Sequence, residues 1–127
     1  EEKLIQEAKA KISNEYFPVK SKRPKLRRSV AQKNIKHFLS LGVDAFAVAD
    51  VMLYTIEIAL KYASKREGLQ ATFYKSFQNS FEQVVHYVIA NGIVSEHKNR
   101  ILEIYNEVNR QKWTNRYEFE TLKDQLD

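Results

Sequence analysis

Glycine and proline are so scarce in this chain that few sharp turns are available to it. The 127 residues contain three glycines and two prolines. Sandwiches and barrels need frequent turns between short strands, so this composition favours long helices instead. No window shows the sustained alternation of apolar and polar residues that a half-buried strand requires. The sequence therefore predicts an all-α fold.

Apolar residues recur at helical spacing in five segments and more weakly in a sixth. We expect helices over residues 2–16, 29–41, about 44–64, from Thr72 to just before Gly92, from Ser95 onward, and around residues 113–126. Pro18 ends the first, because proline disfavours helical geometry in the preceding residue. Ser29 and Asp44 are expected N-caps. Gly42 and Gly92 are expected to end helices in the left-handed conformation.

The segment of about residues 44–64 is apolar over most of its circumference, which is typical of a central helix. Its polar residues Asp50, Glu57 and Lys61, with Tyr54 between them, form one narrow stripe that we expect to face solvent. We predict a compact bundle of five or six helices, a single domain over residues 1–127, with this helix at its centre. The expected inward positions of the first helix are Leu4, Ile5, Ala8, Ile12 and Tyr16. Those of the fourth helix are Phe73, Phe77, Phe81, Val84, Val85 and Val88. Those of the fifth helix are Ile101, Leu102, Tyr105 and Val108.

Positive charge is concentrated in one part of the chain. No acidic residue occurs between Tyr16 and Val43, whereas eight basic residues fall within residues 20–36, which we call the basic segment. The other 13 basic residues are outnumbered by 16 acidic ones, so the formal net charge of +5 arises entirely in the basic segment. Like charges at this density repel one another, which invites a functional explanation.

Four residues of the basic segment are candidate anion-binding residues. Arg27 and Arg28 precede an expected helix start, where free backbone N–H groups and the helix dipole also attract anions. Lys33 and Lys36 lie three residues apart and would project together from that helix. The planar guanidinium of arginine matches phosphate geometry. Nucleic acid and an acidic protein are the two partner classes that this pattern indicates.

A purely structural explanation of the basic segment stays open. Exposed connections are commonly rich in lysine and arginine, and flanking acidic helices can neutralise them. The segment also lacks the interleaved aromatic residues of a surface that stacks single-stranded bases. A helix-turn-helix motif within residues 29–64 is disfavoured, because its second helix is too apolar to reach base edges.

Catalytic motifs are absent from the sequence. Cysteine does not occur, which excludes disulfides and thiolate chemistry, and no two of the three histidines are spaced three or four apart, as a metal-binding pair on a helix would be. We therefore assign no catalytic residue, no metal and no cofactor. An alternative hypothesis is a small hydrolase or transferase site near Glu82 and His86, with Asp50 close by. Glu82 and His86 are four residues apart, so the carboxylate would orient the imidazole.

No membrane attachment is expected, since no apolar run approaches the roughly 20 residues of a membrane span. The absence of cysteine fits a cytoplasmic protein. The chain begins at Glu1 rather than methionine, which is consistent with a domain taken from a longer protein. The sequence does not indicate an oligomeric state. A third hypothesis, a structural oligomerisation module, would need an exposed apolar patch on the fifth or sixth helix.

Short runs spread over most of the chain share one likeness; they cover residues 16–18, 23–31, 35–38, 42–44, 49–54 and 73–74. Together they resemble a family of small bacterial helical proteins known only as a domain of unknown function. The resemblance implies an α-helical fold and a bacterial cytoplasmic setting, and it brings no activity or cofactor with it. The leading hypothesis therefore rests on charge: a non-enzymatic binding or adaptor domain that uses the basic segment against an anionic partner.

Overall fold

The computed structural model describes residues 2–16, 42–65, 71–111 and 124, and these contain four helices and no strand. The helices are α1 (Glu2–Tyr16), α3 (Ala45–Ser64), α4 (Ala71–Ala90) and α5 (Val94–Gln111). The all-α prediction is thereby confirmed. The predicted count of five or six helices is not reached within the described residues. Of the two further helices expected, that of residues 29–41 lies wholly outside them, and that around 113–126 lies outside them except for Asp124.

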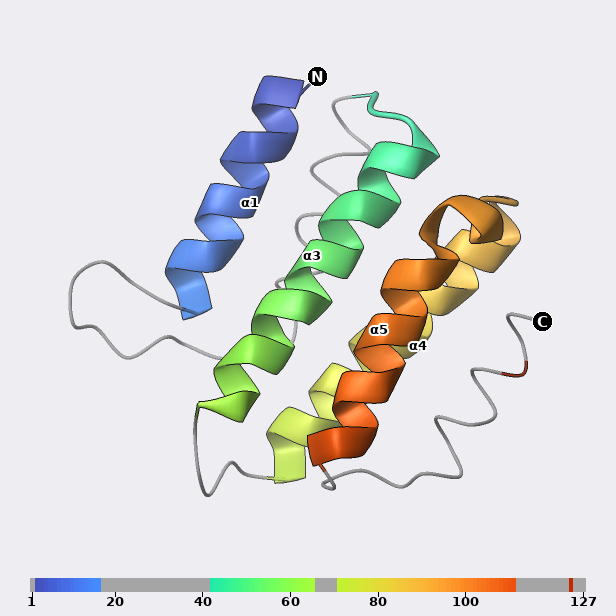
Figure 1. The fold of residues 1–127 in the computed structure, drawn as a ribbon. Helices are drawn as coiled ribbons and strands as arrows, with labels where there is room; N and C mark the ends of the chain where they lie inside the picture. The colour runs from blue at the N-terminus through green and yellow to red at the C-terminus, as the bar shows by residue number, and fades with distance from the viewer. Residues whose placement is uncertain (1, 17–41, 66–70, 112–123, 125–127) are drawn as a thin grey trace.

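Helix α3 is the centre of the described bundle, as its apolar circumference predicted. It packs against α1 on one side and against both α4 and α5 on the other (Figure 1). Twelve of its 20 residues are buried. No described helix is at once long and apolar enough to cross a membrane.

Two helix boundaries, the start of α3 and the end of α4, follow residues that the sequence singled out. The Asp44 carboxylate accepts a hydrogen bond of 2.9 Å from the Ala47 backbone N–H, which satisfies one free donor of the first turn of α3. Gly92 has a φ of +67° and donates its N–H to the Ile89 carbonyl, while Ile93 donates to Val88. This paired arrangement closes the C-terminus of α4, and the left-handed φ explains the glycine.

The core forms where the helical periodicity placed it. All six expected residues of α4 are buried, with Phe81 and the three valines at or below 1% exposure. Ala8 and Ile12 of α1 are buried as well, and Leu4 and Ile5 pack against the core partly exposed. On α5, Ile101, Tyr105 and Val108 are buried, whereas Leu102 is only partly so. Ile104 and His97 are additional buried residues of α5 that the sequence analysis did not identify.

Candidate functional site

The predicted anion-binding residues Arg27, Arg28, Lys33 and Lys36 lie outside the described residues, as does the whole basic segment. Their role therefore stays a prediction. The described residues contain a different group of charges, which joins three helices. We call Lys9, Asp50, Glu57 and Arg100 the charged cluster.

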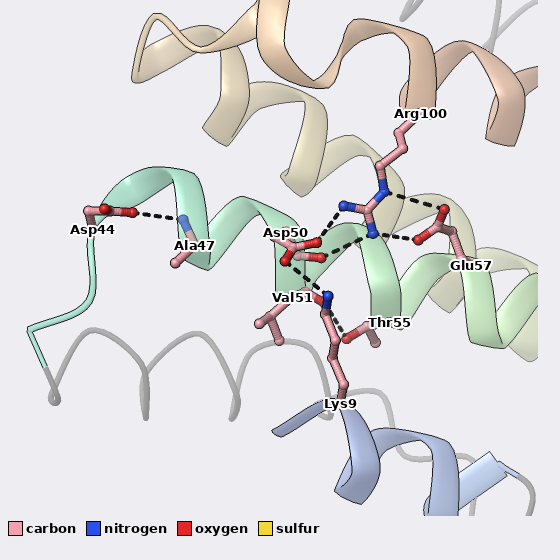
Figure 2. Close-up of polar contacts among 8 residues, drawn as sticks. All are labelled: Lys9, Asp44, Ala47, Asp50, Val51, Thr55, Glu57 and Arg100. Carbon is pink, nitrogen blue, oxygen red and sulfur yellow. Dashed lines mark hydrogen bonds and ion pairs between the residues drawn. The ribbon is translucent and has the colours of Figure 1, made fainter. Parts of the chain in front are cut away.

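Asp50 is the centre of the charged cluster. Its Oδ2 accepts a bond of 3.0 Å from Lys9 Nζ of α1, and its Oδ1 accepts one of 2.5 Å from Arg100 Nη1 of α5 (Figure 2). The other end of the guanidinium reaches Glu57, with 2.6 Å between Nη2 and Oε1 and 3.4 Å between Nε and Oε2. One arginine thus holds two carboxylates of α3, while a lysine approaches from the opposite side.

Helix geometry explains why these residues meet. Asp50 and Glu57 are seven residues apart, so they lie on the same face of α3 about two turns apart. Arginine suits this position because its fork of donors can bond two acceptors at once. The Lys9 ammonium also lies 5.5 Å from the centre of the Tyr54 ring, which stabilises the cation further.

The expectation that this stripe faces solvent is wrong for its two carboxylates. The Asp50 side chain is 22% exposed and that of Glu57 is 36% exposed. Packing of α1 and α5 on either side of the stripe removes much of the water from it, and their cations replace that water. Lys61, the third charged member of the stripe, is exposed as expected.

The electrostatics of the charged cluster favour permanently ionised groups. Burial acts to raise the pKa of Asp50, but hydrogen bonds from Arg100 and Lys9 outweigh it, so that the pKa lies below its ordinary value of 3.8. For Arg100 burial acts to lower the pKa, and the bonds to Glu57 and Asp50 raise it overall. A general acid or base works best with a pKa near the working pH. A salt-bridged Asp50 is therefore better suited to holding helices together than to transferring protons.

Beside the charged cluster, His97 is almost completely buried. The residue is 2% exposed, and its ring centre lies 4.5 Å from that of Phe46. Nε2 is buried without a hydrogen-bond partner. Burial and the positive charge of Arg100 lower the pKa of His97, against smaller opposing effects of Asp50 and Glu96. The spacing of His97 to Ile101, four residues, could have placed it on the inward face of α5 from the sequence.

The alternative enzyme site does not assemble in the described residues. Glu82 and His86 are both exposed on α4, and the Asp50 carboxylate is bonded to Lys9 and Arg100 instead. A surface groove of about 300 Å³ between α3 and α5 includes neither Glu82 nor His86; it is lined by Glu57, Leu60, Lys61, Ser64, Glu103, Ile104 and Glu107. Among the described residues, no three acidic or histidine side chains are grouped so that they could hold a metal ion.

The oligomerisation hypothesis expected an exposed apolar patch on the fifth or sixth helix. The large apolar residues that are exposed in the described part of the chain are Phe46 on α3 and Ile89 on α4. Neither belongs to α5, and the expected sixth helix lies outside the described residues except for Asp124.

A family model described as a family of unknown function (DUF6155) matches residues 1–127. No curated protein and no solved structure matches the chain at a significant level.

Proposed function

The chain belongs to a family of unknown function, DUF6155, and we propose that it is a non-enzymatic binding domain whose basic segment contacts an anionic partner. The partner that best fits the charge pattern is a nucleic acid, bound through its phosphates. An acidic protein is the second candidate.

The observation that carries this proposal is the concentration of eight basic residues in residues 20–36 without one acidic residue from 17 to 43. Asp50 and Glu57, two of the 16 acidic residues of the chain, are already bonded to Lys9 and Arg100 within the described helices. The proposal therefore rests on the density of positive charge in the sequence of the basic segment.

Residue types within the basic segment match phosphate contacts. Arg27 and Arg28 would each offer a planar fork to one phosphate, and Lys33 and Lys36 would add point charges. Contacts of this kind release counterions from the nucleic acid, so affinity falls steeply as salt rises. They carry no sequence information by themselves. We accordingly expect binding that depends on charge much more than on base sequence.

Fluorescence anisotropy with short labelled duplex and single-stranded nucleic acids, at several salt concentrations, tests the proposal. Wild-type protein is expected to bind, and the logarithm of its binding constant is expected to fall linearly with the logarithm of the salt concentration. The variant in which Arg27, Arg28, Lys33 and Lys36 are all replaced by alanine is expected to lose most of its binding, and the binding that remains at low salt is expected to show a smaller salt slope.

A matched control separates the position of these charges from their number. Lys3, Lys11, Lys65 and Lys75 are exposed lysines outside the basic segment, and replacing all four by alanine removes the same four positive charges. This control is expected to bind nearly as well as wild type. Absence of wild-type binding even at low salt, or equal losses in the two variants, would overturn the proposal of a nucleic-acid contact by the basic segment.

A further inference from the structure

His97 is the one described ionisable residue that is buried in the core without a partner for one of its polar atoms. It lies in the first turn of α5, where its ring packs against Phe46 in the first turn of α3. The ring centres are 4.5 Å apart and the planes are inclined by 37°. The contact between the starts of α3 and α5 therefore includes an imidazole whose Nε2 has no hydrogen-bond partner.

We propose that His97 is an acid-sensitive contact between α3 and α5, which holds the start of α5 in place while the imidazole is neutral and loosens it when the imidazole takes up a proton. In the neutral ring, a nitrogen without a proton can stay unpaired at modest cost. Protonation makes both ring nitrogens donors and adds a full charge. An unpaired charged donor in the core has to reach water, and α5 has to move for it to do so.

The surrounding charges favour the neutral ring. Of the described residues, the charged groups that act on His97 are Arg100 and Glu96 from α5 and Asp50 from α3, and α4 contributes none. Arg100 is one turn along the same helix and repels a second cation. The attraction of Asp50 for a cation is largely satisfied, because that carboxylate already accepts bonds from Arg100 and Lys9.

The Phe46 ring acts in the opposite direction, because an aromatic face attracts cations. Phe46 is itself half exposed, which weakens this attraction. Burial of the imidazole acts against the charged form and is the first cause of a His97 pKa below its ordinary value of 6.5.

The sign of the pH dependence follows from this direction. With its pKa lowered by folding, His97 binds a proton less readily in the folded protein than in the unfolded chain. The contribution of neutral His97 to the free energy of unfolding is therefore fully present above about pH 6.5, and it is lost as the pH falls below that value. Each unit by which folding lowers the pKa makes the folded-to-unfolded ratio up to tenfold smaller at acid pH.

Two measurements on the whole chain test the proposal. The first follows the imidazole signals of ¹³C-labelled histidine by NMR from pH 7.5 to 4.5, with His97 assigned from the spectrum of His97→Gln. The second compares amide hydrogen exchange at pH 7.5 and 5.5, corrected for the intrinsic pH dependence of exchange. We expect His97 to titrate below 6.5 and amides in the first half of α5 to lose protection at pH 5.5 relative to amides in the middle of α3, by up to about tenfold.

Replacement by phenylalanine keeps a flat ring and removes the titration, so His97→Phe is expected to show the same protection of α5 at both pH values. His86→Phe, on the exposed face of α4, is the matched control and is expected to loosen at acid pH as wild type does. The proposal is overturned if His97 titrates at or above 6.5, if wild-type α5 is equally protected at both pH values, or if His97→Phe loosens as much as wild type. The wild-type titration decides on its own if His97→Phe does not fold.

Discussion

Arg100→Met is the substitution that most directly tests the charged cluster. Methionine keeps an unbranched side chain of moderate length and removes the guanidinium, so that Glu57 loses its ion pair and Asp50 retains only Lys9. Exposed ion pairs contribute about 0.2–1 kcal/mol, and breaking a fully buried pair costs about 3–5 kcal/mol. The side chains here are 22–36% exposed, which places them between these limits. We expect a loss of about 2 kcal/mol, or roughly a thirtyfold smaller folding equilibrium constant.

Urea unfolding at neutral pH, followed by circular dichroism, measures this loss directly, provided that the slope with denaturant is unchanged. Arg110→Met is a matched control on the same helix. Arg110 pairs with Glu107 three residues earlier, but its side chain is 71% exposed. A pair of that kind stabilises a helix by no more than about 0.5 kcal/mol. The control therefore removes the same chemical group from an exposed pair within one helix, whereas Arg100 joins two carboxylates of another helix.

A double-mutant cycle with Asp50→Asn isolates the interaction between Arg100 and Asp50 from the loss of arginine packing. We expect a coupling energy of about 1 kcal/mol or more, in the range for contacting residues of one network. Equal losses for Arg100→Met and Arg110→Met, together with a coupling energy near zero, would refute the reasoning. The charged cluster would then contribute no more than an ordinary surface pair.

Three further predictions concern single residues of the described helices. Asp44→Ala removes the side-chain acceptor at the start of α3 and is expected to lower the free energy of unfolding by about 1 kcal/mol in urea, whereas Asp44→Asn keeps an acceptor and should cost much less. Gly92→Ala places a Cβ at a φ of +67°, where it meets no neighbouring atom, and is expected to cost about 1 kcal/mol by thermal unfolding from backbone conformation alone. Asp50 has a lowered pKa when folded, so its contribution is present above about pH 3.8 and is lost as the pH falls below that value; acid unfolding of Asp50→Asn should lack this part of the pH dependence.

Local features of the sequence determine most of what could be predicted about the fold. The bounds of α1 and the start of α3 agree with expectation because Pro18 and Asp44 act on their immediate neighbours. The six inward residues of α4 were predictable because a 3.6-residue period alone selects one face. Such signals need no knowledge of which helix lies next to which.

The charged cluster was missed because it depends on that knowledge. Asp50 and Glu57 were recognised as sharing a face, but a stripe of carboxylates looks the same in sequence whether water or an arginine covers it. Arg100 lies 50 residues after Asp50 and Lys9 lies 41 before it, so no local spacing relates them. His97 was missed for a different reason: histidine is intermediate between core and surface residues, and its place on the inward face of α5 was outweighed by its polarity.

The charges of this chain thus fall into two groups with different consequences. In the charged cluster two cations and two anions are matched side by side, so the group contributes to helix packing and has no net charge left to attract a partner. In the basic segment eight cations occur without an anion between them in the sequence, a pattern that would attract an anionic partner. The two groups should therefore separate experimentally. Substitutions in the charged cluster are expected to change the free energy of unfolding without changing the salt slope of binding. Substitutions at Arg27, Arg28, Lys33 and Lys36 are expected to change the salt slope of binding without changing the free energy of unfolding.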